Sequence, residues 1–304
     1  MAHPPADADT RPMWEFVDLL ISLTFYGTAY GMILYCLAVG LSVTLGLMRF
    51  VNLAHGVFAM TGGYLTVTAM SRLGFAFLPA VAVSVVAVGA LGMLVERTLC
   101  RRLYSAPILE QVLFSIGLIF VSSAVARYFF GPLAQPIELP AWLSGRIDIG
   151  VGVFPAYRVF LIGAGAVLAF AIWAGVERSR FGASVRAAVD NRRMAESVGI
   201  NVNRVFTICF GLGTGLAALG GSLGADLLPI YPGYPNDYLV YFLIIVAVAG
   251  LGNLRGAFFV ALTFGVSDTV VRYFLPDLGR ILILLMIMAV LSYKPHGFAP
   301  KTHA

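Results

Sequence analysis

The chain has 304 residues, of which 60% are apolar and only 12% are charged, and its mean hydropathy is +0.89. Soluble domains contain about half apolar and about a quarter charged residues, so water is not the main solvent of this protein. Its net charge of +5 comes almost wholly from arginine, because Lys294 and Lys301 are the only lysines. In so apolar a chain, this excess indicates membrane topology and lipid contact and not nucleic-acid binding.

Apolar stretches long enough to cross a bilayer recur along the chain. About 20 residues of helix cross about 30 Å of hydrocarbon, and the stretches lack the strict alternation of outer-membrane strands. We therefore predict an all-α fold, a polytopic transmembrane helix bundle with about eight spans, some of them broken helices. The expected spans are Phe16–Leu47, Leu53–Met70, Phe77–Val95, Leu109–Phe130, Val159–Val176, Val205–Leu227, Tyr238–Phe264 and Ile281–Tyr293.

The first stretch is longer than one crossing needs, and we expect it to tilt or break near Gly27–Gly31. A polar N-terminal tail (1–15) precedes the membrane domain (16–294), and a short tail (295–304) follows it. The N-terminus lacks the basic-then-apolar order of a cleaved signal peptide. We expect the first helix to stay attached and to direct insertion.

Two arginine-rich loops predict the orientation of the spans. One contains Arg97, Arg101 and Arg102, and the other is the loop 177–204, with six arginines. Two crossings separate these loops, so both should face the cytoplasm, and the intervening Pro- and Gly-rich segment 131–158, with a β-like stretch at 146–154, should lie outside. Eight crossings would place the lysine-bearing C-terminus outside, which conflicts with the preference of basic residues for the cytoplasmic side. An interruption at Gly250–Gly256 could hide a re-entrant turn that changes the number of crossings.

Small residues within the spans predict close helix contacts. Gly211 and Gly215, then Gly220 and Gly224, are spaced by four residues and share a helix face, which favours packing within the bundle; a dimer or ligand face is the alternative. The three cysteines, Cys36, Cys100 and Cys209, are far apart in or beside apolar stretches, and we expect them to act as small hydrophobes.

Polar residues interrupt the apolar pattern between the first two spans. Arg49, Asn52 and His55 occur there, followed by Gly56. Two interpretations stay open: a broken helix that lines a translocation path, or a plain cytoplasmic turn in which Asn52 and His55 cap a helix. A short echo at Gly252-Asn253 is consistent with an internal repeat around a central site or with chance similarity, and makes Asn253 a further path candidate.

The segment 177–201 has mixed charge, and apolar or small residues recur in it at approximate helical spacing up to Gly199, which suits a helix end. We predict one short amphipathic cytoplasmic helix. Such a helix can lie on the lipid surface, or its small-residue face (Ala187, Ala188, Met194, Ala195, Val198) can seat in a groove of a soluble partner, which we favour.

These residues carry a resemblance to known permeases. The order Gly182, Arg186, Ala187, Asp190, Ala195, Gly199, Ile200 resembles the coupling-helix loop of ABC importer permeases, and Asn52-Leu-Ala-His-Gly56 resembles the branched-chain amino acid permeases. Agreement extends through Glu96-Arg97, the Gly250–Gly256 interruption and Pro295-His-Gly-Phe298, from about Tyr26 to Phe298. Val57 and Phe58 stand where relatives often have an acidic residue, which leaves the exact substrate open.

The resemblance implies a permease subunit of the bacterial inner membrane and not an enzyme. It also implies four kinds of partner: the lipid bilayer, a second homologous permease, two cytoplasmic ATPase subunits and an extracytoplasmic solute-binding protein. The sequence contains no Gly-x-x-x-x-Gly-Lys-Ser/Thr loop, so we expect ATP with Mg²⁺ to be bound by the partner subunits. It also contains no metal-binding Cys/His spacing and no nucleophile elbow, so we expect no cofactor, metal or catalytic residue in this chain.

Alternating access for branched-chain or related amino acids is the leading hypothesis, and it rests on the resemblance. Importers of urea, short amides and aromatic or dicarboxylic acids occur in the same family and remain alternatives. An ion-coupled secondary transporter would need a carboxylate at mid-span, for which Asp268 is the plausible candidate.

Overall fold

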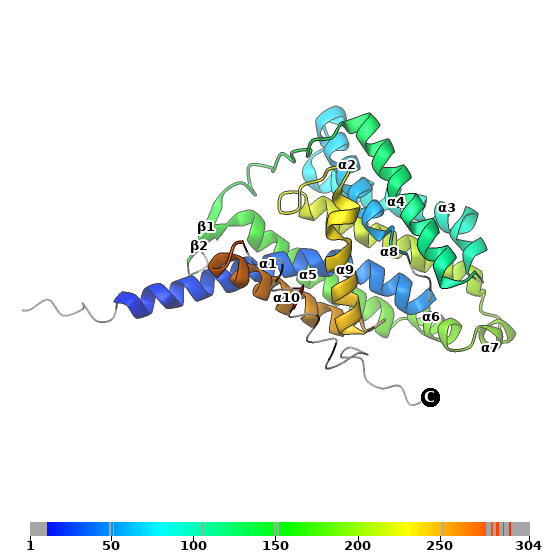
Figure 1. Cartoon of the computed structure of the whole chain (residues 1–304). Coiled ribbons are helices and arrows are strands. Elements are labelled where there is room, and N and C mark those ends of the chain that lie inside the picture. The colour runs from blue at the N-terminus through cyan, green and yellow to red at the C-terminus, as the bar shows by residue number, and fades with distance from the viewer. Residues whose placement is uncertain are drawn as a thin grey trace, which may run out of the picture.

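A computed structural model gives the fold. It describes residues 11–277 apart from 49, 51, 105, 149, 151 and 251, and beyond these only 281, 284, 285, 288 and 292. The fold is a helical bundle with one small hairpin (Figure 1). Its elements are α1 (Arg11–Met48), α2 (His55–Leu73), α3 (Phe77–Thr98), the 3₁₀ turn η1 (Cys100–Leu103), α4 (Ile108–Phe130), β1 (Arg146–Asp148), β2 (Val153–Pro155), α5 (Ala156–Ile172), the π-helical turn η2 (Trp173–Glu177), α6 (Arg180–Asp190), α7 (Arg192–Ser197), α8 (Val202–Gly224), α9 (Tyr234–Ala249) and α10 (Leu254–Phe274).

The predicted all-α transmembrane bundle is confirmed, but the predicted count of eight spans is not. Within the described residues, six helices are long and apolar enough to cross a membrane: α1, α3, α4, α5 with η2, α8 and α10. Helix α2 has 19 residues but is less apolar, and α9 has only 16. Most of the expected last span, Arg49 and the C-terminal tail with its lysines lie outside the described residues.

Helix α1 runs through the middle of the bundle without a break, so of the two alternatives near Gly27–Gly31, a tilt or a break, the break is wrong. These glycines instead permit a helix crossing. A Cβ on Gly31 would lie 2.8 Å from the carbonyl oxygen of Ala261, and one on Gly265 would lie 2.5 Å from the Cα of Gly31. Helix α10 therefore crosses α1 at backbone contact, which only residues without a side chain allow.

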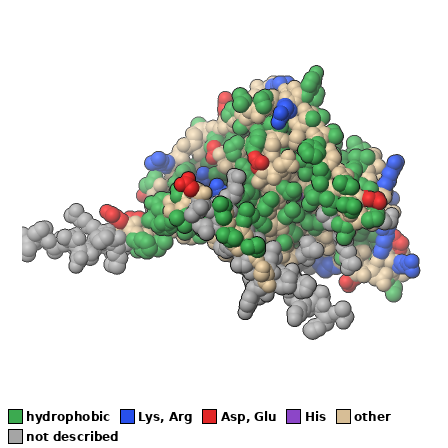
Figure 2. All heavy atoms as spheres, viewed as in Figure 1, with side chains coloured by type: hydrophobic (Ala, Val, Ile, Leu, Met, Phe, Trp, Pro, Cys, Tyr) green, Lys and Arg blue, Asp and Glu red, His purple; other side chains and the backbone are tan. Residues whose placement is uncertain are grey.

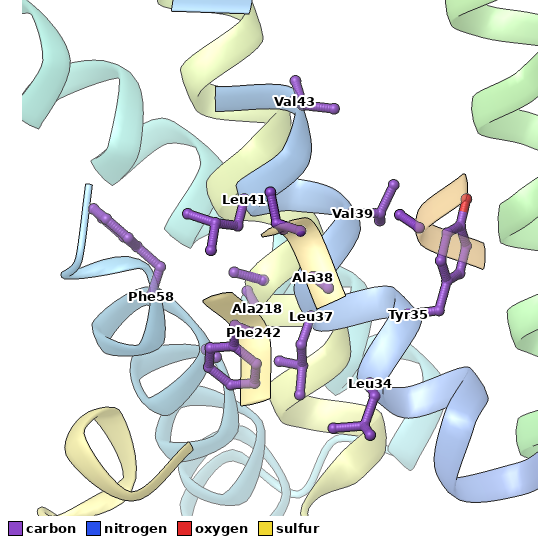
Figure 3. Close-up of a cluster of buried hydrophobic side chains, with 14 of the residues drawn as sticks. Leu34, Tyr35, Leu37, Ala38, Val39, Leu41, Val43, Phe58, Ala218 and Phe242 are labelled. Carbon is purple, nitrogen blue, oxygen red and sulfur yellow. The ribbon is translucent and has the colours of Figure 1, made fainter. Parts of the chain in front are cut away.

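Helix α8 is the second buried helix, and its spaced glycines pack as the sequence favours. Gly211 and Gly215 face α3, where the nearest atoms to an added Cβ include those of Met93 and Val85. Gly220 and Gly224 face α1 at Leu37 and Ile33. The core between α1, α2, α8 and α9 includes Leu34, Leu37, Leu41, Phe58, Ala218 and Phe242 (Figure 3).

The expected seventh span is two helices. Gly250 and Gly252 adopt positive φ angles of 89° and 76°, which end α9 and start a tight turn, and the side chain of Asn253 then caps α10 by accepting from the N–H of Gly256 at 2.9 Å. The chain thus turns at the Gly250–Gly256 interruption, the place that the sequence had offered for a turn that changes the span count.

The expected β-like stretch forms the antiparallel hairpin β1–β2, which pairs Ile147 with Phe154. The hairpin lies at the end of the bundle opposite to α6 and α7 (Figure 1). A single bridge between Gln135 and Ile230 joins the segment 131–158 to the loop after α8. We call the end with α6 and α7 the inner end and the end with the hairpin the outer end, following the predicted orientation.

Apolar side chains also cover the outside of the bundle. Figure 2 shows hydrophobic side chains over much of one face. Large exposed apolar residues occur along α4 and α5, including Leu113, Phe120, Val167 and Phe170. A soluble monomer rarely exposes so much contiguous apolar area, so these helices are expected to contact lipid or another membrane subunit.

Candidate functional site

The inner end carries the surface with the most distinctive chemistry, formed by α6 and α7. The sequence predicted one helix here, but the structure has two, divided at Asn191. This residue has extended backbone angles, and its side chain accepts a hydrogen bond from the N–H of Met194 at 3.0 Å, so it caps α7. Asparagine is a preferred N-cap, which is the signal in the sequence that could have placed the break.

The small residues of this segment face the protein's own bundle. Val185, Ala188 and Ala195 are buried, and an added Cβ on the buried Gly182 would collide with the carbonyl oxygen of Val176. The prediction that the whole small-residue face seats in a partner is therefore wrong for Ala188 and Ala195. Among the other residues of the coupling motif, Ala187 and Ile200 are half-buried, and Gly199 ends the segment with a φ of 86°.

A mixed polar and apolar face remains exposed. Met194 and Val198 are 63% and 70% exposed, and Arg186 and Asp190 are also exposed. We call these four residues the inner docking face. Met194 and Val198 belong to the face that the sequence predicted to seat in a partner, and both are open to contact; helical spacing alone did not show that Ala188 and Ala195 pack inward.

Several hydrogen bonds fix this face to the membrane helices. Arg186 donates to the carbonyl oxygen of Val176 at 2.7 Å, which joins α6 to η2. Arg192 donates to Glu196 at 3.1 Å and to the Oδ1 of Asn203 at 3.0 Å, which joins α7 to the first turn of α8. The inner docking face is thus attached both to the end of α5 through η2 and to α8.

A buried carboxylate lies beside this attachment. Glu96, at the end of α3, is fully buried and accepts hydrogen bonds from Thr207 at 2.7 Å, from the Tyr104 hydroxyl at 2.9 Å and from Arg101 at 3.2 Å. Arg101 also donates to Thr207 at 2.8 Å. Burial, and then the charge of Glu96, raise the pKa of Tyr104, so the hydroxyl stays a donor. Because Thr207 belongs to α8, this network joins the arginine-rich loop after α3 to the start of α8, which follows the second arginine-rich loop. Both loops therefore lie on one side of the bundle.

The predicted path residues Asn52 and His55 are buried in this conformation. The Nε2 of His55 donates to the carbonyl oxygen of Leu37 at 3.0 Å, a partner that fixes the tautomer, and the Oδ1 of Asn52 accepts from the N–H of Ala54 at 3.1 Å. Neither side chain caps α2, whose N-cap is Ala54. The Asn52 Nδ2 and the His55 Nδ1 have no hydrogen-bond partner within the described structure.

The other two path candidates occupy different places. Gly56 allows the start of α2 to approach α9, since an added Cβ would lie 2.9 Å from the Cα of Pro235. Asn253 acts as the N-cap of α10, as described above, and also donates to the carbonyl oxygen of Ala249 at 3.1 Å. The structure therefore gives Gly56 a packing role and Asn253 a capping role in this conformation.

Comparison with known proteins identifies the family. Residues 23–291 match the family described as "Branched-chain amino acid transport system / permease component". The chain belongs to this family. It is therefore a transport permease subunit and not an enzyme, and with its six apolar helices it is a multi-pass protein of the inner (plasma) membrane.

Named relatives match over most of their length. The permease is 26% identical to the high-affinity branched-chain amino acid transport system permease protein BraD of Pseudomonas aeruginosa, over 94% of this chain and 96% of that protein. It is 24% identical to the probable branched-chain amino acid transport permease protein LivH of Methanocaldococcus jannaschii, over 88% and 89%. Among solved structures, PsaBC from Streptococcus pneumoniae in complex with Fab is similar over 95% of this chain and 97% of that chain, with 17% identity and a TM-score of 0.49.

Proposed function

We propose that this permease forms the translocation path of an ATP-driven importer for branched-chain or related amino acids. The observation that carries the proposal is the inner docking face, an exposed surface tied by side-chain hydrogen bonds to α8 and to the end of α5, in a chain without a nucleotide-binding loop. The family relatives named for branched-chain amino acid transport support the substrate class. The partners would be two cytoplasmic ATPase subunits, a second homologous permease and an extracytoplasmic solute-binding protein.

The contacts suggest how force would reach the membrane helices. A load on α6 and α7 would pass through Arg192 and Asn203 into α8, and through Thr207 and Glu96 into α3. Helix α8 packs against α1, α2 and α3, so a displacement at the inner end would be felt across the bundle. ATP-driven closure of the ATPases would supply this load in an alternating-access cycle.

The path near Asn52, His55, Gly56 and Asn253 belongs to this proposal. Asn52 and His55 are buried here, yet each has one polar atom without a partner, and such atoms are costly in a dry core. We infer that another conformation of the cycle opens this region to water or to solute, which would satisfy the Nδ2 of Asn52 and the Nδ1 of His55.

The test uses the exposed apolar residues of the inner docking face. Met194→Glu together with Val198→Glu should reduce recovery of the ATPase subunits in mild detergent and should abolish ATP-dependent uptake, because two charges would have to be desolvated at the interface. Met194→Leu with Val198→Ile is the matched control and should retain both. Uptake assays with leucine, urea, an amide, an aromatic acid and a dicarboxylic acid would separate the candidate substrates.

Two results would overturn the proposal. Normal ATP-dependent uptake by the doubly charged variant would remove the inner docking face from the coupling role. Transport by the purified chain alone, driven by an ion gradient, would show that no ATPase partner is required.

A further inference from the structure

A polar cavity lies at the outer end of the bundle, away from the inner docking face, and its lining includes Asp268. It has a volume of about 550 Å³, and its walls come from α1, the start of α5, the loop after α8, α9 and α10. That loop contains Ile230, which bridges to the segment 131–158. This volume lies within the range of about 300–1,000 Å³ that is usual for small-molecule sites.

One wall of the cavity carries an incompletely bonded carboxylate. Asp268 on α10 is only 2% exposed. Its Oδ2 accepts from the Nε of Arg272 at 2.7 Å, and Arg272 also reaches the Tyr241 hydroxyl at 3.3 Å, whereas Oδ1 has no hydrogen-bond partner within the described structure. A buried carboxylate oxygen without a donor is unfavourable, so the site is suited to a ligand that brings an N–H group.

The opposite charge is available on a different element. Arg158, at the start of α5, lines the same cavity and lies over the ring of Tyr26, with 5.6 Å between Cζ and the ring centroid. Guanidinium groups pair with carboxylates in a directional, charge-assisted geometry. Tyr26 and Tyr30 add aromatic rings to the wall formed by α1, and such rings suit an apolar side chain with a polar rim.

We propose that this cavity is an entry site for a zwitterionic solute of the α-amino acid class. The ammonium group would donate to the Oδ1 of Asp268, the carboxylate would accept from Arg158, and the side chain would lie along the rings of Tyr26 and Tyr30. This inference rests on the proposed function for its substrate class. It adds that the permease itself recognises both charged groups, independently of any binding protein.

The site can be tested by solute protection, with no need for partner subunits. A cysteine introduced in the cavity wall by Leu227→Cys would be labelled with a maleimide in the full-length permease in lipid nanodiscs. Leucine should slow labelling at least threefold. The deaminated analogue 4-methylpentanoate and the decarboxylated analogue 3-methylbutylamine, at equal concentration, should slow it much less, because each lacks one of the two charged groups.

Variants then assign the two charges. Asp268→Asn and, separately, Arg158→Gln should each abolish protection by leucine. If Asp268→Asn fails to fold, Arg158→Gln still tests the site, because it leaves the ion pair between Asp268 and Arg272 in place. Asp148→Asn is the control, since its carboxylate lies in the outer hairpin and bonds the N–H of Gly150 at 2.8 Å; protection should persist.

The outcomes separate this inference from the proposed function. Absence of protection in the parent Leu227→Cys protein, or equal protection by all three solutes, would overturn the entry site even if the assembled importer transports leucine. Protection that depends on Asp268 and Arg158 would support the site even if ATP-dependent uptake of amino acids were not found.

Discussion

Replacing Gly221 by alanine should test whether backbone contact between helices holds the bundle together. Gly221 lies on α8, and an added Cβ would lie 2.6 Å from the carbonyl carbon of Ala59 on α2, with the carbonyl oxygen nearer still. Carbon atoms normally approach to about 3.5–4.0 Å, so the two helices would have to separate by about 1 Å. Overpacking costs about 1–3 kcal/mol, and the upper end applies because the obstacle is backbone and not a flexible side chain.

The net effect also includes helix propensity, which favours alanine over glycine by about 1 kcal/mol. Gly221→Ala should thus lose about 2 kcal/mol, or about 4 °C in melting temperature at about 2 °C per kcal/mol. Gly117→Ala on α4 is the matched control, because an added Cβ there meets nothing within 4 Å, and its melting temperature should stay unchanged or rise. Thermal unfolding of both variants in one detergent measures the difference. Equal shifts for the two variants would refute the reasoning.

Three further predictions concern the inner half of the protein. Glu96→Gln removes the negative charge to which Arg101, Tyr104 and Thr207 donate. It should lower the stability of the folded protein by about 2 kcal/mol in thermal unfolding, because a buried ion pair loses one partner while Arg101 stays partly solvated. The exposed control Glu110→Gln should cost under about 0.5 kcal/mol, and an unchanged stability of Glu96→Gln would contradict the network. Burial raises the pKa of the Cys100 thiol to about 12. At pH 8 this thiol should therefore react with maleimide on the order of 1,000-fold more slowly than a free cysteine, and the reaction should become faster as the pH rises. Peptide mass spectrometry measures the labelling, and fast labelling at pH 8 would contradict the prediction by showing that the site opens. His55→Ala should lower the transport rate more than it lowers yield or melting temperature, whereas unchanged kinetics would return the segment around His55 to a plain structural turn.

The helical bundle was predictable because apolar length alone specifies a membrane-spanning helix. The expected bounds Phe77–Val95 and Leu109–Phe130 differ from α3 and α4 by three residues or fewer at each end. The stretch from Tyr238 to Phe264 was counted as one span, with an interruption noted at Gly250–Gly256, because averaged hydropathy does not register a turn made of glycines. Gly250, Gly252 and Asn253 are stop and start signals for helices, and they would have divided it.

The candidate site was less accessible from sequence. The coupling segment could be located, because mixed charge between two apolar spans is a local pattern. Its orientation could not, since the burial of Ala195 and the exposure of Met194 depend on contacts with distant helices. The outer cavity could not be predicted from the sequence, because Tyr26, Arg158 and Asp268 come from widely separated segments. Only the spacing of Asp268 and Arg272 by four residues indicated a helical ion pair.

The glycine contacts also limit where the bundle can bend. Gly40 and Gly213 hold α1 and α8 at backbone contact, and Gly221 holds α8 against α2, so these three helices should move as one body. The π-helical turn η2 joins α5 to α6, and such turns often mark functional sites. If ATPase partners drive the cycle, as proposed above, the motion should concentrate at η2. Spin labels on α5 and α6 should change separation when ATP is added to the assembled importer, whereas labels on α1 and α8 should not. A change of several ångströms between α1 and α8 would show that the central helices slide and that the glycine contacts are not a rigid joint.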